Sequence, residues 1–359
     1  MHLGVEASRM AEDWRGIGRY TRQLLRHFAS LRPDLRVTLF ADAKPDEAIQ
    51  LKAELAGMGY EPGRGALAPL RALQTDPPEL AWYPWNKTKY FSRAPRMVVT
   101  IHDLVPFHFR YRSWFKQGVQ RKIERRFRQT AERADLILTD SVHAGADIVR
   151  QLGVPQAKVM VIPLAADDFD PGTGAPDLNR LSRFGLKPVP FFLYVGANEE
   201  RKNLGRLRQA FGQLRAEGFD AELVICGPEA PGNGVEPGVR WVGRVSEAEL
   251  RVLYRAARAF VFPSLYEGFG LPVLEAMACG TPVICSRATS LPEVAGDAAL
   301  YFDPLDVPAL TGAMIRCQTD PGLRADLSAR SLHQASRFRW AETARQTLAA
   351  FDGIRPPQS

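Results

Sequence analysis

The stretch of residues 259–304 limits the fold of this chain more than any other part of the sequence. It starts with a short apolar run at 259–263 and continues through the loop Glu267-Gly268-Phe269-Gly270. Pro272 then suits the first turn of a helix, and a second apolar run starts at Pro282. A strand, a loop, a helix and a strand in this order predict part of a parallel sheet, with the glycine-rich loop at the carboxyl end of a strand.

The same alternation of strand and helix patterns runs along both halves of the chain. Strands are expected at 2–6, 36–40, 80–83, 97–101, 136–139, 159–163, 191–196, 221–226, 239–242, 259–263 and from 282. Helices are expected at 20–31, 203–217, 247–257 and 340–351. The stretch 57–78 is expected to be variable, and the Pro-, Gly- and Asp-rich stretch 163–177 to be a linker. With 359 residues, the chain suits two α/β domains, each built on a parallel sheet.

Composition excludes several classes of protein. An apolar fraction of 45% with 24% charged residues is typical of a globular protein, and the apolar runs have strand length, far short of a membrane span. The first residues carry acids where a signal peptide has an apolar core, and the four cysteines show no CxxC spacing. We therefore expect a cytoplasmic protein with buried free thiols.

Most of the net charge of +7 comes from one segment, Arg110–Arg133, which has nine bases and two acids. On a helix, one apolar stripe (Phe115, Val119, Ile123 and Phe127) would lie beside Arg121, Lys122, Arg125, Arg126 and Arg128. Such a helix could bind the anionic inner face of the cytoplasmic membrane. It could equally pack on its own domain with an arginine-rich face toward solvent. A nucleic-acid partner is not expected, because the chain has no recognised binding module.

Two glutamates flank the glycine-rich loop, with seven residues between them. Glu267 follows the strand and Glu275 falls near the first turn of the helix, so both can face one ligand. Backbone N–H groups at a helix N-terminus, which glycines leave accessible, favour a phosphate group. The plain alternative is a pair of solvated carboxylates at the edge of an ordinary α/β unit. The surrounding sequence SLYEGFGLPVLEAMACGTPVI favours a binding site.

A basic loop follows the expected strand at 191–196. It runs from Gly196 to Asn203, and Arg201 and Lys202 lie just before a helix. Two adjacent cations can neutralise a diphosphate, the arginine through a forked contact and the lysine as a point charge. The alternative is a charged helix start without a ligand.

Two motifs of the N-terminal half also follow strands. Gly16 and Gly18 form a G-x-G in RGIGRY, which alone fits a tight turn as well as a phosphate loop, and the missing third glycine argues against a nicotinamide dehydrogenase. His102 and Asp103 come at the end of the strand at 97–101, where ligands of parallel sheets bind. A structural histidine is the alternative. As a ligand contact, a neutral imidazole could accept a proton or form a hydrogen bond, and Asp103 could orient it.

The spacing of Glu267 and Glu275 within SLYEGFGLPVLEAMACG closely resembles the E-x7-E signature of retaining GT-B glycosyltransferases of family 4. The loop at 196–203 resembles the G-x-x-x-x-R-K-N/G segment of that family, and RGIGRY resembles its N-terminal glycine loop. Many relatives have an arginine directly after the first glycine, where this chain has Ala197, so the basic role falls on the two later cations. The resemblance covers nearly the whole chain.

The resemblance implies a GT-B fold, with two Rossmann-like parallel-sheet domains that face each other across a cleft. The expected domains are 1–168 on the acceptor side, 169–335 for the nucleotide sugar, and a C-terminal helix at 336–359 that returns to the N-terminal domain. Catalytic roles are expected for His102, Glu267, Arg201 and Lys202. Contacts to the donor are expected from Gly16, Gly18, Gly196, Arg201, Lys202, Glu267, Gly268, Phe269, Gly270, Leu271 and Glu275.

The resemblance also implies the reaction. GIGRY, TIHDLVP and the E-R-K-N loop look most like bacterial transferases that move mannose from GDP-mannose to lipid-linked oligosaccharides in polysaccharide synthesis. A UDP- or dTDP-sugar donor and a catalytically inactive scaffold subunit are the alternatives. The triplet Asp168-Phe169-Asp170 has the D-x-D form that holds a metal in GT-A transferases, but it falls in the expected linker. No metal and no cofactor is therefore expected.

Overall fold

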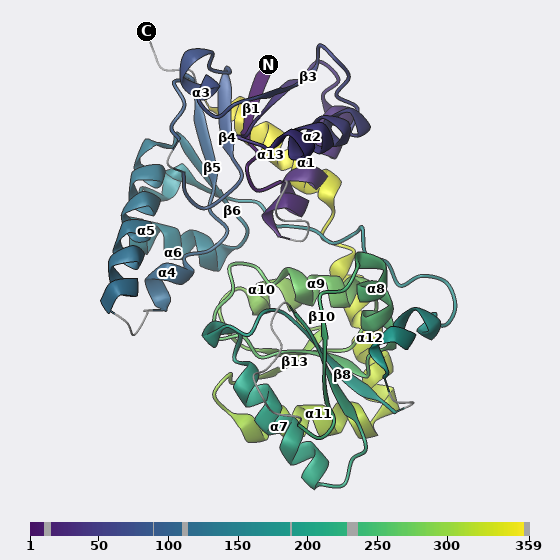
Figure 1. Ribbon diagram of the computed structural model, residues 1–359. Coiled ribbons are helices and arrows are strands. Elements are labelled where there is room, and N and C mark those ends of the chain that lie inside the picture. Colours follow the sequence, from purple (N-terminus) through teal and green to yellow (C-terminus); the bar gives the residue numbers. More distant parts are fainter. Residues whose placement is uncertain (11–15, 89, 110–113, 187–188, 228–235, 355–359) are drawn as a thin grey trace. The chain divides into compact units, whose positions relative to one another are not determined.

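The computed structural model in Figure 1 describes residues 1–10, 16–88, 90–109, 114–186, 189–227 and 236–354. These residues form two compact units. The N-terminal unit comprises Met1–Leu164 and the chain from Arg339 on, and the C-terminal unit comprises Ala165–Phe338. Each unit is built on its own parallel sheet, so the predicted α/β architecture of two parallel-sheet domains is confirmed.

The N-terminal unit contains a seven-stranded sheet in the order β3-β2-β1-β4-β5-β6-β7. Its strands are β1 (His2–Glu6), β2 (Arg36–Phe40), β3 (Gly65–Ala68), β4 (Leu80–Tyr83), β5 (Met97–Thr100), β6 (Leu136–Thr139) and β7 (Val159–Val161). Its α-helices are α1 (Ile17–Leu31), α2 (Pro45–Gly57), α3 (Ala72–Thr75), α4 (Val105–His108), α5 (Trp114–Arg133), α6 (Val142–Leu152) and α13 (Trp340–Gly353). The strand order reverses between β1 and β4, which pair directly.

Alternate residues of the strands face two different cores, as the period of a strand requires. Tyr83 of β4 lies in a cluster with Phe127 of α5 and Ile148 of α6. Trp82, its neighbour in the chain, packs instead against Phe351 of α13, with 5.7 Å between the ring centroids. Helices therefore cover both faces of this sheet, and α13 packs beside α1 (Figure 1).

No helix or strand was predicted in the stretch 57–78, which was expected to be variable. It contains β3 and α3, and β3 pairs in parallel with β2. The sequence of β3, GALA, has no β-branched or aromatic residue, so its composition gives no strand signal. Its Gly65 is packed closely, because an added Cβ would lie 2.7 Å from the carbonyl oxygen of Tyr60.

The C-terminal unit contains a six-stranded sheet in the order β10-β9-β8-β11-β12-β13. Its strands are β8 (Phe191–Val195), β9 (Glu222–Cys226), β10 (Val239–Gly243), β11 (Ala259–Phe262), β12 (Val283–Ser286) and β13 (Ala299–Phe302). Its α-helices are α7 (Leu204–Ala216), α8 (Glu247–Ala256), α9 (Leu271–Ala278), α10 (Leu291–Ala295), α11 (Val307–Thr319) and α12 (Pro321–Ala335). Here the strand order reverses between β8 and β11, which pair in parallel.

The four cysteines are free and buried, as predicted. Within the described parts of the chain, no helix combines the length and the apolar character that crossing a membrane requires.

Candidate active site

The predicted site residues of the C-terminal unit follow two neighbouring strands. Arg201 and Lys202 lie in a 3₁₀ turn after β8, and Glu267 lies in the loop after β11. In an open parallel sheet, ligands bind beyond the carboxyl ends of the strands where the strand order reverses. The reversal between β8 and β11 therefore brings together residues that are 65 positions apart in the sequence.

A buried ion cluster joins these three side chains. The Lys202 ammonium donates to Glu267 Oε1 at 2.7 Å, and Arg201 Nη1 donates to Glu267 Oε2 at 3.3 Å. Arg201 also donates to the exposed carboxylate of Glu199 at 2.7 Å. Lys202 and Glu267 are each less than one-tenth exposed. The structure therefore brings into direct contact Glu267 and the two cations, which were predicted separately as donor-binding residues.

The charge state of Glu267 follows from this arrangement. Burial acts to raise the pKa of the Glu267 carboxyl, but the charges of Lys202 and Arg201 outweigh burial, so its pKa is held below the ordinary value of 4.5. Glu267 is ionised at neutral pH and neutralises part of the positive charge of the loop. A carboxylate held in this way can accept hydrogen bonds from ligand hydroxyl groups.

Asn203 holds the basic loop against the sheet. Its φ is +57°, a left-handed conformation, and its side-chain amide donates to the carbonyl oxygens of Pro263 at 3.0 Å and Pro304 at 2.7 Å. The backbone N–H of Leu265 donates to the carbonyl oxygen of Arg201 at 2.7 Å. The loops after β8 and β11 are thus tied together independently of the ion pairs. Sequence reasoning placed Asn203 at a helix start only, although asparagine tolerates this backbone conformation better than most residues do.

The glycine-rich loop 267–270 is held by the segment before α10. The N–H of Glu267 donates to the Thr289 hydroxyl at 3.0 Å. The Ser290 hydroxyl lies 3.0 Å from the carbonyl oxygen of Glu267 and 2.8 Å from that of Phe269. Sequence reasoning missed both residues. The only available signal was Ser290 itself, a residue type typical of the start of a helix.

The rest of the loop leads into α9. Gly268 and Phe269 are buried, and the Phe269 ring packs on Phe338 with 6.0 Å between centroids. Gly270 has a φ of +109°, and Leu271 is the first, half-buried residue of the helix. Gly196, at the end of β8, is half-buried and accepts no substitution easily, because its added Cβ would lie 2.8 Å from the Tyr194 hydroxyl.

Glu275 lies on α9, and its contact is with a neighbouring helix. Its carboxylate Oε2 accepts a hydrogen bond from the Tyr254 hydroxyl of α8 at 3.1 Å, and both side chains are buried. This partner was not predicted, because the two residues are 21 positions apart and belong to different helices. Whether Glu275 also contacts a ligand stays a prediction.

His102 of the N-terminal unit lies just after β5 and is enclosed. Its ring Nδ1 is 2.7 Å from Asp140 Oδ2, and its Nε2 is 3.2 Å from the carbonyl oxygen of Pro84. The Tyr20 ring packs against it in a T-shaped arrangement, with 4.9 Å between the centroids. Burial acts to lower the pKa of His102, but the Asp140 charge and hydrogen bond outweigh it, so the pKa lies above 6.5.

The N-terminal glycines lie at the start of α1 in the same unit as His102. Gly16 is exposed at the N-cap position, and Gly18 is buried in the first turn. Arg15 of the RGIGRY motif lies outside the described residues. Asp103, next to His102, accepts hydrogen bonds from the Val105 N–H at 3.3 Å and the Asn86 amide at 3.4 Å. Its contacts are therefore with the backbone and Asn86 rather than with the imidazole.

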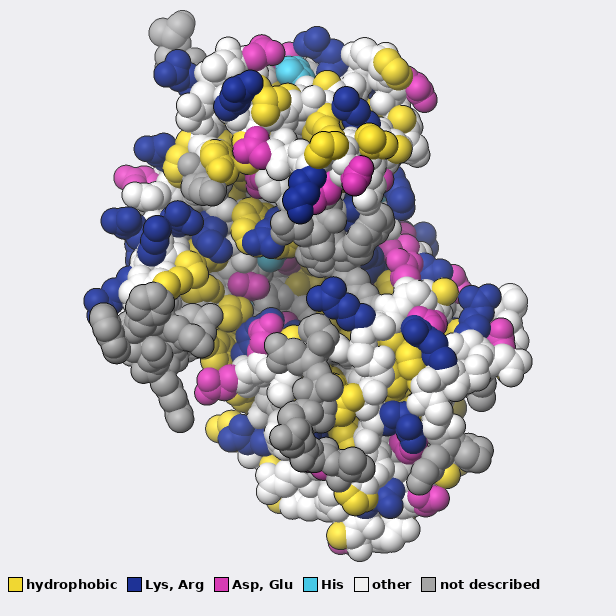
Figure 2. Space-filling view, in the orientation of Figure 1, with side chains coloured by type: hydrophobic (Ala, Val, Ile, Leu, Met, Phe, Trp, Pro, Cys, Tyr) yellow, Lys and Arg dark blue, Asp and Glu magenta, His cyan; other side chains and the backbone are white. Residues whose placement is uncertain are grey.

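The basic helix α5 packs on its own unit. Phe127 is buried and Ile123 packs against the same core, whereas Val119 is exposed. Figure 2 shows Lys and Arg side chains gathered over the surface of α5, at the left of the view. Arg121, Lys122, Arg125 and Arg128 are exposed, and Arg126 is half-buried. Residues 110–113 and the Phe115 side chain of the predicted stripe lie outside the described residues.

The D-x-D triplet lies at the start of the C-terminal unit, in the segment after β7. Asp170 accepts a hydrogen bond from the Gly172 N–H at 2.7 Å, and Phe169 packs on Tyr254. Among the described residues, no three His, Cys, Asp or Glu side chains form a group that could hold a metal ion.

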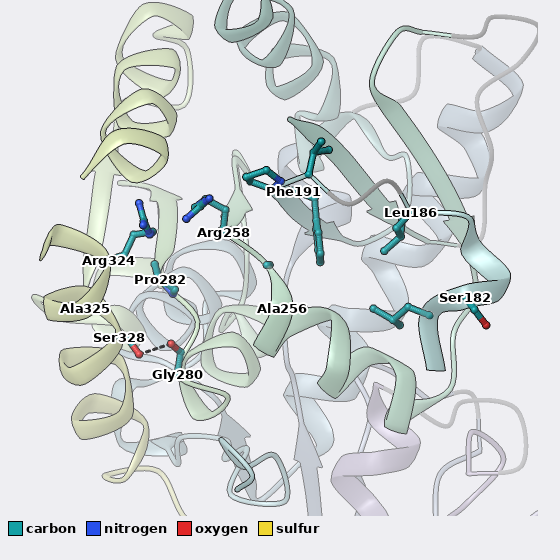
Figure 3. A pocket seen from close by; sticks show the side chains of 14 residues that line it. Ser182, Leu186, Phe191, Ala256, Arg258, Gly280, Pro282, Arg324, Ala325 and Ser328 are labelled. Atoms are coloured by element: carbon teal, nitrogen blue, oxygen red, sulfur yellow. Dashed lines mark hydrogen bonds between the residues drawn. The ribbon is translucent and has the colours of Figure 1, made fainter. Parts of the chain in front are cut away.

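A large cavity of the C-terminal unit lies away from the ion cluster. It has a volume of about 860 Å³ and opens beside Phe191, the first residue of β8, and Pro282, just before β12. Figure 3 shows that Arg258 and Arg324 extend side by side near Pro282. These positions are the amino ends of the strands, opposite to the loops that carry Lys202 and Glu267. Volume alone therefore does not mark the candidate site.

Comparisons with known proteins agree with the two-unit division. The family profile described as "Glycosyl transferases group 1" matches residues 183–334, and "Glycosyltransferase Family 4" matches residues 14–168. O-antigen chain mannosyltransferase B of Escherichia coli is 33% identical over an alignment that covers 94% of this chain and 95% of that protein. The serotype-specific mannosyltransferase WbdA of Escherichia coli is 30% identical, over 71% of this chain and 33% of that longer protein.

Solved structures share the fold. HepE of Anabaena, crystallised in complex with UDP-glucose, superposes with a TM-score of 0.75 over 98% of this chain and 99% of that one. The sequence identity is 16%, so this likeness shows a common architecture only.

Proposed function

Because the chain belongs to glycosyltransferase family 4 and has its GT-B fold, we propose that it transfers mannose from GDP-mannose, with retention of configuration, to a hydroxyl group of a lipid-linked oligosaccharide. The reaction would serve polysaccharide synthesis. One observation supports the site of transfer above all others, namely the contact of Lys202 and Arg201 with Glu267 where the strand order reverses.

The cluster suits the chemistry of a nucleotide sugar. Lys202 and Arg201 set two positive charges against the single buried carboxylate of Glu267, while the exposed Glu199 is screened by water. A diphosphate that enters the loop would meet this excess of positive charge. As the sugar leaves, charge develops on the diphosphate, and preorganised cations that stabilise it lower the barrier. Glu267 would then accept hydrogen bonds from the sugar hydroxyls.

The identity of the sugar rests on the relatives. Two of them are mannosyltransferases by name, and one aligns over almost the whole chain. The second candidate is a UDP-sugar donor, the class of ligand with which HepE was crystallised. Attack by the acceptor hydroxyl on the face that the diphosphate leaves would give retention without a covalent intermediate.

A panel of GDP-, UDP-, dTDP- and ADP-sugars tests the proposal. The true donor should raise the melting temperature, because a ligand at a hundred times its dissociation constant stabilises the folded state by about 2.7 kcal/mol. It should also release nucleoside diphosphate slowly in the absence of acceptor. A scaffold subunit would release none. If a donor other than GDP-mannose gave both signals, the mannose assignment would be wrong while the glycosyltransferase assignment stood.

We further propose that transfer needs no metal ion, since Arg201 and Lys202 can meet the diphosphate charge. Turnover should then survive a chelator. Loss of turnover in EDTA with recovery in Mn²⁺ would instead point to the Asp168 and Asp170 carboxylates.

A further inference from the structure

The N-terminal unit has a reversal of strand order of its own, between β1 and β4. A pocket of about 330 Å³ lies at the carboxyl ends of these strands, a size at the lower end for small-ligand sites. Glu6 and Arg9 reach it from the end of β1, and Trp85 and Lys87 reach it from the segment after β4. Arg126 of α5 also lines it. The pocket therefore occupies the position where open parallel sheets bind ligands.

Two of the three cations in this pocket lie against one aromatic ring. The Arg9 guanidinium lies 3.9 Å from the centroid of the Trp85 ring, and the Lys87 ammonium lies 4.8 Å from it. Lys87 is also 5.2 Å from the ring centroid of Phe127, which fixes its position between two aromatic side chains. Among the described residues, neither Lys87 nor Arg126 has a carboxylate within 4 Å.

The like charges act on one another. Burial lowers the pKa of the Lys87 ammonium, and the charges of Arg9 and Arg126 lower it further, against the opposite effect of Asp103. The carboxylates of the pocket each accept a backbone hydrogen bond, Glu6 from the Ser8 N–H at 3.2 Å and Asp42 from the Leu70 N–H at 3.0 Å, and the charge of Arg9 also acts on Glu6. Cations crowded in this way gain stability when an anion enters. The carboxylates remain able to accept hydrogen bonds from hydroxyl groups.

We propose that this pocket is the acceptor subsite and that it binds a phosphate group joined to a sugar, with Arg126, Lys87 and Arg9 on the phosphate and Glu6 and Asp42 on sugar hydroxyls. The assignment of the pocket to the acceptor rests on the proposed function, whereas the proposal that it binds a phosphate group does not. A lipid-linked saccharide and a free phosphosugar present the same group.

The test measures binding to the full chain by calorimetry. Arg201→Ala and Lys202→Ala are introduced together, so that the cations of the ion cluster cannot bind the probes. The probes are mannose 1-phosphate, its farnesyl phosphodiester, and neutral methyl mannoside. We expect both phosphorylated probes to bind more tightly than methyl mannoside, and their affinity to fall as salt rises. Tighter binding of the farnesyl diester identifies a lipid-linked source, and equal binding identifies the phosphosugar alone.

Arg125 provides a matched control, because it is the neighbour of Arg126 on α5 but is exposed and does not line the pocket. Arg126→Gln should weaken both phosphorylated probes by about tenfold or more, as expected for a lost charged hydrogen bond. Arg125→Gln should change them less than about twofold. Equal effects of the two substitutions, or equal binding of neutral and phosphorylated probes, would overturn the proposal. If binding fails while the wild type still transfers sugar, only this subsite is wrong.

Discussion

Both ring nitrogens of His102 face groups that can only accept hydrogen bonds. Nδ1 meets the Asp140 carboxylate and Nε2 meets the carbonyl oxygen of Pro84. With Asp140 ionised, both contacts are hydrogen bonds at once only if each nitrogen carries a proton, which makes the ring an imidazolium. The raised pKa of His102 also favours the protonated ring. Of the two roles left open by the sequence, proton acceptance by a neutral ring is therefore the less compatible with this geometry.

Asp140→Asn should lower the pKa of His102, because the attraction of the carboxylate is lost while burial, which favours the neutral ring, remains. The raised folded pKa means that the ion pair stabilises the fold below pH 6.5 and that this stability disappears as pH rises through the folded pKa. The wild type should thus exceed Asp140→Asn in stability by more at about pH 6 than at about pH 9. NMR titration of the imidazole measures the pKa directly. Asp103→Asn is the control, since its effect on His102 is smaller.

Glu267→Gln should lower turnover by about a hundredfold or more, because it removes the charge beside Arg201 and Lys202 while it keeps the shape. Glu199→Gln is the matched control, since Glu199 also pairs with Arg201 but is half-exposed. Steady-state kinetics with the donor identified in the panel provide the measurement, with circular dichroism to check the fold. A loss of the same size in both variants would mean that Arg201 alone, and not the position of Glu267, governs the rate.

At the scale of elements, the loop 267–270 depends on a backbone conformation that only glycine adopts easily. Gly270 has a φ of +109°, and an added Cβ would lie 2.6 Å from Leu291 Cδ2 of α10. The contact between Gly270 and Leu291 sets how closely α10 approaches α9. The residues just before α10 form the hydrogen bonds that hold the loop. The conformation of the loop therefore depends on the packing of α9 against α10.

Gly270→Ala should destabilise the protein by more than about 1 kcal/mol, through backbone strain and the contact with Leu291. Gly212→Ala is the control, because Gly212 lies inside α7 with no atom within 4 Å of the added Cβ. That substitution should stabilise the protein by up to about 1 kcal/mol, since alanine favours helices. Urea denaturation compares the two variants. A stable Gly270→Ala would show that the loop tolerates another conformation.

The strands could be predicted where burial is complete. β8 and β11 are continuous apolar runs because both faces of a parallel sheet are covered, and their predicted bounds differ from the observed ones by a single residue. The helix α2 was missed because only Leu51 and Leu55 of it are buried, which leaves little periodicity to detect.

The candidate site could be predicted only as far as residue types within one loop allow. The cations or the carboxylate of each loop can be read from its sequence. No spacing in the sequence shows that Lys202 contacts Glu267, which is 65 positions away. Asp140 was missed for the same reason, since it lies 38 positions from His102 and meets it only through the pairing of β5 with β6. Contacts of this kind depend on the order of strands in the sheet, which cannot be read from the sequence.

At the scale of the whole molecule, the positive charge divides into two sets on α5. Arg126 lines the pocket of the N-terminal unit, whereas Arg121, Lys122 and Arg125 are exposed and are within 4 Å of no described carboxylate. The apolar side chains Ile123 and Phe127 are already used for packing on the core. Any attraction of this helix to a membrane would therefore be electrostatic and would involve its exposed cations, Arg121, Lys122 and Arg125 among them.

Charge reversal of Arg121, Lys122 and Arg125 to Glu should abolish co-sedimentation with phosphatidylglycerol-containing vesicles at low salt. Each cation near an anionic surface contributes about 1 kcal/mol, so the loss of three alone weakens binding by about a hundredfold. Arg126 stays unchanged, so transfer to a short acceptor without a lipid should be spared. The control reverses three exposed cations elsewhere in the unit, Lys44, Lys52 and Arg71, with the same change of net charge. If both triple variants lose binding equally, net charge alone acts, and if the wild type never co-sediments, α5 serves only to pack against the core.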